Sequence, residues 1–281
     1  MTRISFLNDS FIDHSNAYVH IEDRGMQFAD GVYEVIFFYK NKLIDNEWHL
    51  DRLFRSLGEI NIKLDLSYEK LSNICLELCK RNNFQDASIY IQITRGATSR
   101  NQLIPVGLNP TIIITVSPIS LTTLDELEKG YSAVTLEDIR WQRCDIKSIG
   151  LLASSLTKQK AIDMGYSEAI FIRNNIVTEC SFSNLFIVDN NNNLVTKNLD
   201  NQVLAGITRR RIIALAKEIG IAVIERSFSS EELIKSKEAF ATSTTLLIRP
   251  LTKINDTIIS NGKCGQITRR LIDKYQQFLN T

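Results

Sequence analysis

The hydrophobic pattern of the first part of the chain predicts short strands and two helices. Four segments rich in β-branched and aromatic residues are bounded by turn-forming residues. Strands are therefore predicted at residues 3–7, 32–39, 87–94 and 111–116. Apolar residues recur at three- and four-residue intervals over 50–57, which is typical of a helix with one buried face, and a second helix is predicted over 67–81.

The remainder of the chain mixes strands and helices in the same way. Strands are predicted near 131–137, 168–173, 184–189, 221–225 and 237–242. Helices are predicted near 151–164, 207–219, 229–236 and 264–279. The segment Pro118–Thr123 is rich in serine and threonine and has no periodicity, which is typical of a linker. We therefore expect an α+β chain with a small domain over 1–118, a linker over 119–124 and a larger domain over 125–281, with a ligand in the cleft between them.

The composition argues against several classes of protein. A formal charge of +1 and the lack of a sustained basic block argue against binding to nucleic acid. The sequence shows neither a signal peptide nor an apolar run approaching the roughly 18 residues of a membrane span, so we expect a cytoplasmic protein without a membrane partner. The five cysteines form no C-x-x-C pair and the three histidines form no cluster, which predicts free thiols and no metal site.

One lysine and one carboxylate have the chemistry that pyridoxal phosphate requires. Lys147 lies in RWQRCDIKSIG (140–150) among small and apolar residues, and Glu179 lies in VTECSFSN (177–184). A lysine amine can hold the aldehyde of this cofactor as a Schiff base, and a carboxylate can keep its pyridine nitrogen protonated. Most lysines are solvated surface residues, so the pair gains weight only from the sequence around it.

That surrounding sequence resembles the fold-type IV enzymes, which use pyridoxal phosphate. The group contains D-amino-acid aminotransferases, branched-chain aminotransferases and aminodeoxychorismate lyases. The resemblance runs in order through EDRGMQFADGVYEV (22–35), HLDRL (49–53), TRGATSR (94–100), RWQRCDIKSIGLLASSLTKQKA (140–161), TECSFSN (178–184), LAGITR (204–209) and ATSTT (241–245). Within the group, DGVYEV, RWQRCDIKS and GITR are most similar to the bacterial D-amino-acid aminotransferases. The resemblance implies a two-domain α+β fold of type IV with the cofactor in the interdomain cleft.

The resemblance also implies which residues bind the cofactor. Lys147 would be the covalent lysine and the proton shuttle, and Glu179 would lie opposite the pyridine nitrogen. Leu204 would pack on the cofactor ring. Contacts with the phosphate are implied for Ile207, Thr208, Thr244 and Arg52, because the start of a helix and a guanidinium both suit an anion. The alternative explanations are helix capping for Thr208 and surface exposure for Arg52.

The residues that would bind the substrate depart from the family pattern at one position. In the D-amino-acid enzymes a tyrosine, an arginine and a histidine bind the substrate α-carboxylate; Tyr33 and Arg100 match the first two, but Gln102 replaces the histidine. Glutamine donates a hydrogen bond but cannot carry the charge of an imidazolium. We therefore expect a weaker carboxylate site in which Arg100 supplies most of the attraction.

The sequence thus predicts a pyridoxal-phosphate-dependent aminotransferase that acts on a D-amino acid such as D-alanine and on a 2-oxo acid, pyruvate or 2-oxoglutarate. The resemblance implies a ping-pong reaction through pyridoxamine phosphate and a homodimer in which the partner chain completes the site. Gln102 leaves three other activities open on the same scaffold: transamination of branched-chain L-amino acids, transamination of (R)-amines, and the aminodeoxychorismate lyase reaction. A family member that has lost catalysis, and an ordinary α+β binding module, are the alternatives from other classes.

Overall fold

The computed structural model describes residues 3–281, which form two compact units. The first unit contains the chain up to Ser120 together with Ile146–Gly150, and the second contains Leu121–Asp145 and Leu151–Thr281. The short segment Ile146–Gly150 thus lies in the first unit, whereas the sequence analysis placed it in the second domain. In the described residues no helix is both long enough and apolar enough to span a membrane.

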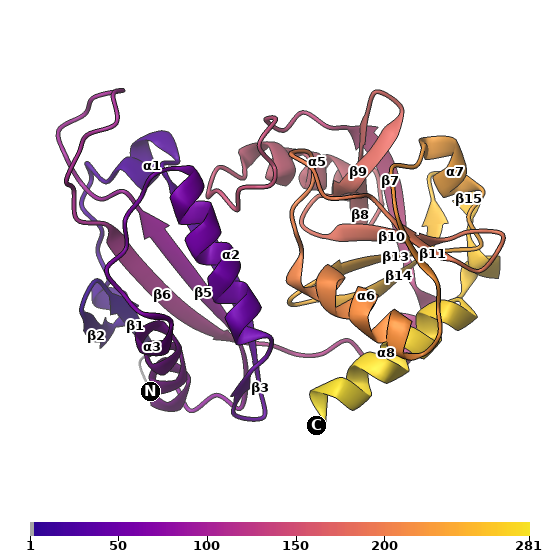
Figure 1. The fold of residues 1–281 in the computed structure, drawn as a ribbon, viewed down its shortest axis with the longest axis horizontal. Helices are drawn as coiled ribbons and strands as arrows, with labels where there is room; N and C mark the ends of the chain where they lie inside the picture. Colours follow the sequence, from indigo (N-terminus) through magenta and orange to yellow (C-terminus); the bar gives the residue numbers. More distant parts are fainter. Residues whose placement is uncertain (1–2) are drawn as a thin grey trace. The chain divides into compact units, whose positions relative to one another are not determined.

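The first unit is an antiparallel sheet covered by two long helices (Figure 1). The strands follow the order β2-β1-β6-β5-β3-β4. Its elements are β1 (Ile4–Leu7), β2 (Ser10–Asp13), η1 (His14–Asn16), α1 (Arg24–Phe28), β3 (Gly31–Tyr39), β4 (Lys42–Leu43), α2 (Asn46–Glu59), α3 (Tyr68–Arg81), β5 (Asp86–Thr94) and β6 (Thr111–Pro118). The four strands and both helices predicted here are confirmed, whereas β2 and α1 are too short to have produced a periodic signal.

Alternating burial explains why these strands form one half-buried sheet. On β5 every second residue from Ala87 to Ile93 is fully buried, and these side chains pack with apolar residues of α2 and α3 in one core. Residues between them face the other side of the sheet, as a strand requires. The apolar stripes of the two helices therefore pack on the same face of the sheet, where they form one core with β5.

The segment Ile146–Gly150 joins this sheet along β3. The backbone amide of Tyr33 donates a hydrogen bond to the carbonyl of Lys147 (2.9 Å), and the amide of Ile149 donates to the carbonyl of Gly31 (3.2 Å). An antiparallel bridge joins Val32 and Ser148. Strand β4 is only two residues long, so this end of β3 would otherwise be an open edge with unpaired backbone groups.

The second unit is built on a larger mixed sheet. Its strands follow the order β12-β11-β10-β13-β14-β7-β8-β9, and β15 pairs with β14. Its elements are α4 (Leu124–Lys129), β7 (Tyr131–Glu137), α5 (Leu152–Asp163), β8 (Glu168–Arg173), β9 (Ile176–Cys180), β10 (Asn184–Val188), β11 (Leu194–Thr196), α6 (Ile207–Glu218), β12 (Val223–Glu225), α7 (Ser230–Ile234), β13 (Glu238–Ser243), β14 (Leu247–Ile254), β15 (Thr257–Ile258), η2 (Ser260–Gly262) and α8 (Gln266–Leu279).

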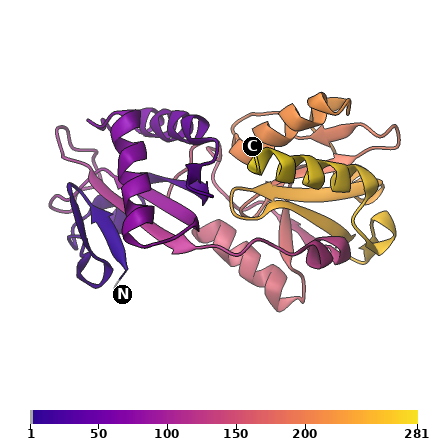
Figure 2. The ribbon, with the colours of Figure 1, turned by 90° about the horizontal axis from the view of Figure 1, so that it is seen from below.

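The central strands of this sheet are buried on both faces. Every residue of β10 is buried; Leu185 and Ile187 belong to a core that also contains Phe228 and Leu233, whereas the ring of Phe186 stacks on that of Phe240 at 5.0 Å. Helices α6 and α8 lie side by side and both contact β13 (Figure 2). The sequence pattern predicts β10 and β13 but not β9 and β14. Pro250 lies inside β14, and proline removes a backbone donor, which weakens the sequence signal for a strand.

A buried ion pair joins α2 to the sheet of the first unit. The guanidinium of Arg52 grips the carboxylate of Glu34 with two hydrogen bonds, from Nε (2.9 Å) and Nη2 (2.6 Å), and His49 Nδ1 lies 3.0 Å from the same carboxylate. Arg52 is buried, so surface exposure is excluded for this residue. Burial by itself would raise the pKa of Glu34, but Arg52 and His49 hold it well below its usual value of 4.5.

The first prediction concerns the stability that this ion pair provides. Glu34→Gln should lower the free energy of unfolding by about 3 kcal/mol at neutral pH, because it leaves Arg52 buried without its carboxylate. The pKa of Glu34 is depressed in the folded state, so the ion pair contributes fully to the free energy of unfolding above the usual glutamate pKa of 4.5. This contribution is lost as the pH falls from 4.5 toward the lower pKa of the folded state. The difference between the parent and the variant in urea denaturation should therefore shrink below about pH 4.5.

The half-exposed Glu59, which pairs with Arg55 on the surface of α2, provides the control for this measurement. Glu59→Gln should change the unfolding free energy by less than about 0.5 kcal/mol. Equal effects of the two variants would contradict a special role for the buried pair.

Candidate active site

Lys147 projects from the segment that extends the sheet of the first unit. Its Nζ lies 4.2 Å from the centre of the Tyr33 ring, and its backbone amide donates a hydrogen bond to Ser56 Oγ on α2 (3.4 Å). The side chain is half-buried, and among residues 3–281 no carboxylate forms an ion pair with it. The structure thus brings together Lys147 and Tyr33, two of the residues that the sequence analysis selected.

Arg52 lies near this pair within the same unit. It precedes Ser56 by four residues on α2, and residues four apart share one face of a helix. Its partners Glu34 and His49 were not selected from the sequence, because Glu34 lies on β3 and nothing in the local pattern shows that it meets His49 and Arg52 of α2.

Arg100 and Gln102 lie in an exposed loop between β5 and β6. The guanidinium carbon of Arg100 lies 4.6 Å from the centre of the Phe28 ring, and none of the residues from 3 to 281 forms an ion pair with Arg100. No hydrogen bond or ring contact among these residues joins Arg100 or Gln102 to Lys147 or Tyr33. A guanidinium that is exposed and lacks an acidic partner is available to an anionic ligand.

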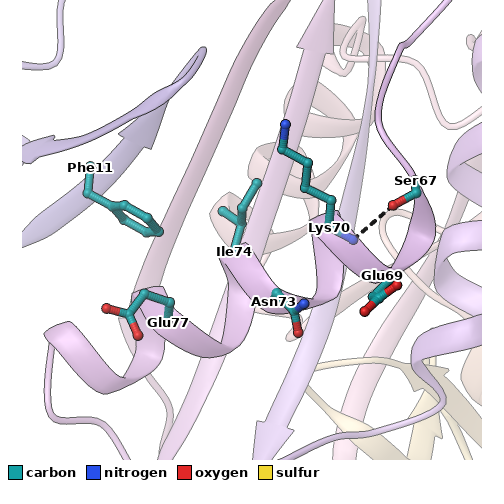
Figure 3. Close-up of a pocket in the computed structure, with 7 residues that line it drawn as sticks. All are labelled: Phe11, Ser67, Glu69, Lys70, Asn73, Ile74 and Glu77. Carbon is teal, nitrogen blue, oxygen red and sulfur yellow. Dashed lines mark hydrogen bonds between the residues drawn. The ribbon is translucent and has the colours of Figure 1, made fainter.

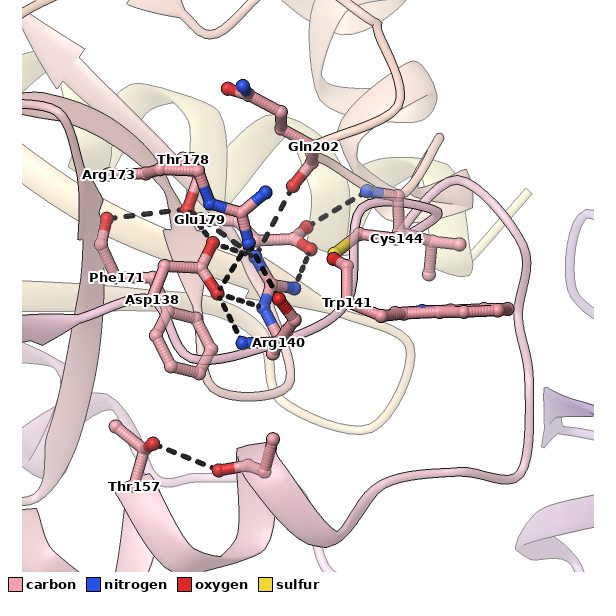
Figure 4. A network of polar contacts seen from close by, with 12 residues as sticks. Asp138, Arg140, Trp141, Cys144, Thr157, Phe171, Arg173, Thr178, Glu179 and Gln202 are labelled. Atoms are coloured by element: carbon pink, nitrogen blue, oxygen red, sulfur yellow. Dashed lines mark hydrogen bonds and ion pairs between the residues drawn. The ribbon is translucent and has the colours of Figure 1, made fainter. Parts of the chain in front are cut away.

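Glu179 is the centre of a polar network in the second unit (Figure 4). It lies on β9 and is buried, with 5% of its surface exposed. One carboxylate oxygen accepts a hydrogen bond from Arg140 Nη1. The other accepts from Asn184 Nδ2 (2.9 Å) and from the backbone amide of Leu204 (3.1 Å). The orientation of this carboxylate is therefore fixed by three different elements of the chain.

Arg140 forms ion pairs with two carboxylates, those of Glu179 and Asp138. It donates to both oxygens of Asp138, at 2.9 Å from Nε and 2.9 Å from Nη2, and its guanidinium carbon lies 4.3 Å from the centre of the Phe171 ring. Arg173 also pairs with Asp138 at 3.2 Å. Burial raises the pKa of Glu179 above its usual value, and Arg140 opposes this rise without reversing it. A further positive group at Glu179, such as a protonated pyridine nitrogen, would stabilise the ionised carboxylate.

The start of α6 lies beside this network and offers backbone donors. Gly206 is the N-cap residue and has no side chain to cap the helix, so Thr208 in the first turn is not the capping residue. The first turn of a helix leaves amide groups without intrahelical partners, and these groups attract anions. A Cβ atom at position 206 would lie 1.9 Å from Asn184 Oδ1, so only glycine allows α6 to begin this close to β10.

Two buried hydroxyl groups lack partners in the same region. Ser183 Oγ and Thr242 Oγ1 are buried and form no hydrogen bond within the described part of the chain. Thr242 on β13 is directly opposite Asn184 on β10, and Thr244 follows in the turn after β13. Buried hydroxyl groups normally have a hydrogen-bond partner, so these two point to an absent acceptor. Together with Glu179 and the start of α6, they fit a ligand that carries a phosphate and an aromatic nitrogen.

A shallow pocket in the first unit lacks such features (Figure 3). It lies along α3, and its lining residues are Phe11, Ser67, Glu69, Lys70, Asn73, Ile74 and Glu77. The polar residues are exposed or half-exposed, and the Ser67 hydroxyl only caps the helix by accepting from the amide of Lys70 (3.1 Å). Among the described residues, no cluster of three or more histidine, cysteine or acidic side chains is suitable for a metal ion.

Comparison with known proteins connects these features to one family. The chain is 37% identical over 281 residues to a D-alanine aminotransferase of Staphylococcus haemolyticus, covering 100% of this chain and 99% of the relative. It is 39% identical over 267 residues to a D-alanine aminotransferase of Listeria monocytogenes, covering 94% and 92% of the two chains. The crystal structure of the branched-chain amino acid aminotransferase of Escherichia coli has a TM-score of 0.94 at 26% identity, covering 99% of this chain and 95% of that one.

The family model of class IV aminotransferases matches residues 31–254. This match extends from β3, which carries Tyr33, to the end of β14, and it includes Lys147, Glu179 and the start of α6. The two-domain α+β fold of type IV is therefore confirmed. The chain belongs to the class IV aminotransferases, which use pyridoxal phosphate.

Proposed function

We propose that this protein transfers the amino group of a D-amino acid such as D-alanine to a 2-oxo acid. The observation that carries the proposal is the buried Glu179 beside an anion-attracting helix start, in a chain that is similar over its whole length to D-alanine aminotransferases. Branched-chain aminotransferases share the fold, but at lower sequence identity than the D-alanine aminotransferases. Transamination of a branched-chain L-amino acid is therefore the second candidate.

Lys147 and Glu179 have complementary roles in this proposal. Bound pyridoxal phosphate supplies an aldehyde carbon that can carry the amino group and a ring that withdraws electrons. The amine of Lys147 would hold this aldehyde and would serve as the base that moves a proton at the substrate α-carbon. Glu179 would keep the pyridine nitrogen protonated, and its hydrogen bonds from Asn184 and Leu204 fix the orientation of its carboxylate.

The phosphate group would be held by backbone amides and hydroxyl groups. Ile207 and Thr208 occupy the first turn of α6, and Thr244 follows β13 next to the unpartnered hydroxyl of Thr242. In this proposal Arg52, which is also paired with Glu34, would contribute positive charge near the phosphate, and Leu204 would pack on the ring. The backbone of Leu204 is already fixed by Glu179 and Asn184, which supports this position.

The substrate α-carboxylate would be bound by Tyr33, Arg100 and Gln102. Arg100 is exposed and forms no ion pair with any residue from 3 to 281, so its charge is available for this purpose. Gln102 replaces the histidine of the D-amino-acid enzymes and adds a neutral donor. Arg100 therefore provides the main electrostatic attraction.

We also propose a cytoplasmic homodimer. The loop that carries Arg100 exposes Leu103 and Val106, and nearby in the first unit Ile21 and Met26 are exposed as well, each by more than 60% of its surface. Exposed apolar surface of this kind is typical of a protein interface. Free thiols on all five cysteines suit a reducing compartment.

The choice of donor tests the proposed function directly. Purified protein should use D-alanine with a higher kcat/KM than L-leucine or (R)-1-phenylethylamine when 2-oxoglutarate or pyruvate is the acceptor. The reason is that the chain is 37% and 39% identical to two D-alanine aminotransferases and that Arg100 favours a donor with a carboxylate. The measurement is the initial rate over a range of donor concentrations. A preference for L-leucine would replace the proposal with the second candidate.

Lys147→Ala should remove the covalent link to the cofactor and the proton shuttle together. The variant should lose the visible absorption that the linked cofactor gives, and its kcat should fall on the order of 10³-fold or more. Absorption spectra and single-turnover rates measure the two effects. The exposed Lys160 on α5 is the control, and Lys160→Ala should behave like the parent. Normal turnover in Lys147→Ala would assign the covalent role to another lysine.

Glu179→Gln keeps the size of the side chain but removes the charge at the pyridine nitrogen. The turnover should fall on the order of 10²-fold, while the fold and the cofactor content remain close to those of the parent. The measurements are kcat, circular dichroism and cofactor content after gel filtration. Glu137→Gln changes an exposed carboxylate at the end of β7 and should have no effect. A Glu179→Gln enzyme with full turnover would show that the carboxylate is misassigned.

A further inference from the structure

Arg24 is a buried arginine within the segment 22–35, and it has no role in the proposed mechanism. It begins helix α1, and only 3% of its surface is exposed. Its Nε donates to Asp30 Oδ2 (2.7 Å). Arg95 donates to the two oxygens of the same carboxylate at 2.7 and 2.9 Å. Burial would raise the pKa of Asp30, but these two arginines lower it, so the carboxylate is ionised and anchors both guanidinium groups.

The other side of the Arg24 guanidinium holds the loop between β5 and β6. Its Nη1 donates to the backbone carbonyl of Asn101 (2.6 Å) and lies 3.4 Å from that of Leu103. Asn101 is the residue between Arg100 and Gln102, the two loop residues proposed to bind the substrate carboxylate. Arg24 therefore fixes the peptide that connects them.

Arg24 also contacts the ring on which Arg100 rests. The guanidinium carbons of Arg24 and of Arg100 each lie 4.6 Å from the centre of the Phe28 ring. The face of an aromatic ring is negative, so it attracts both cations. The ring of Phe28 thus orients the side chain of Arg100, while Arg24 holds the backbone that follows it.

The tip of this loop has little other support. Among residues 3–281, the Arg24 side chain makes the only hydrogen bonds that connect residues 100–104 to other elements; the amide of Leu103 bonds within the loop, to Asn101 Oδ1. The base of the loop is held separately, because the amide of Arg24 donates to the carbonyl of Gly96 (3.0 Å) and the amide of Thr98 to that of Glu22 (3.3 Å).

The platform that carries Arg24 is tightly packed. A Cβ atom at Gly25 would lie 2.3 Å from the Thr94 side chain, so α1 lies directly against β5. Asp23, which caps α1, also accepts hydrogen bonds from the hydroxyls of Thr94 (2.9 Å) and Thr111 (2.7 Å), at the two ends of the loop. Arg24 therefore projects from a tightly packed base toward a loop tip that, among residues 3–281, no other side chain of another element holds by hydrogen bonds.

We propose that Arg24 is a positioning residue for substrate recognition, which holds the 100–104 loop so that Arg100 and Gln102 present their donors to the substrate carboxylate. This inference rests on the proposed function for its catalytic consequence. Preorganised donors bind an anion without first having to be ordered, so loss of the tether weakens binding of the substrate. The chemistry at Lys147 and Glu179 is left unchanged.

The test compares Arg24→Met with Arg95→Met. Both variants remove a buried arginine from Asp30, but Arg95 holds the carbonyls of Ile60 and Asn61 instead of the loop tip. Arg24→Met should raise the KM for D-alanine and lower kcat/KM roughly 10- to 100-fold, with kcat and cofactor content close to the parent values. Arg95→Met should change KM little.

Two further measurements separate positioning from a general loss of structure. Trypsin should cleave after Arg100 several-fold faster in Arg24→Met than in the parent or in Arg95→Met, because cleavage requires a mobile chain. In an Arg100→Ala background, Arg24→Met should add little to the increase in KM, since its effect acts through Arg100. If Arg24→Met does not fold, Arg24→Lys and Phe28→Leu provide milder versions of both measurements.

The outcomes distinguish this inference from the proposed function. Equal effects of Arg24→Met and Arg95→Met on KM and on trypsin cleavage would overturn the inference and leave only a structural role for Arg24. Full additivity with Arg100→Ala would also overturn it. A parent enzyme without activity on D-alanine would overturn the proposed function instead, while the trypsin comparison would still decide whether Arg24 fixes the loop.

Discussion

The site in the second unit depends on the side chain of Asn184. Its amide donates to Glu179 Oε2 (2.9 Å) and to the carbonyl of Leu204 (2.9 Å), and its oxygen lies where a side chain at position 206 would have to go. One residue thus connects the end of β9, the segment before α6 and the first turn of that helix. Asn184 holds the carboxylate proposed for the pyridine nitrogen and also lies against the helix start proposed for the phosphate. The distance between these two groups is therefore fixed by one side chain at the start of β10.

Two buried glutamates differ in how well their partners compensate the charge of the carboxylate. Glu34 receives both hydrogen bonds of one arginine and faces a histidine, and its pKa is lowered. Glu179 shares Arg140 with Asp138, and its pKa is raised. Both are almost fully buried, so the desolvation cost is similar, and the compensating charge makes the difference. Arg52 and His49 stabilise the ionised form of Glu34. The pKa of Glu179 remains raised, so an additional cation such as a protonated pyridine would favour its ionised form.

Local pattern was sufficient for most of the fold. Strand β5 and helices α2 and α3 have a single apolar face, and their periodicity places them within a few residues of the observed bounds. Strand β14 was missed because Pro250 interrupts its pattern, and α1 was missed because five residues are too few for a periodic signal. The segment Ile146–Gly150 belongs to the first unit because it pairs with β3, a long-range contact that local pattern does not encode.

By itself, the sequence determined the family, and it predicts the chemistry of the site because Lys147, Glu179 and the Gly206-Ile207-Thr208 start of α6 are residue types in recognisable local motifs. Only the tertiary structure decided how these groups are held. Arg140 reaches Glu179, Asn184 reaches Leu204 and Arg24 reaches Asn101 across long separations along the chain. The physical reason is that a buried polar group requires a partner in space, and any donor of suitable geometry can provide it. The sequence specifies that such a partner must exist, and the packing of the sheets and helices selects which residue it is.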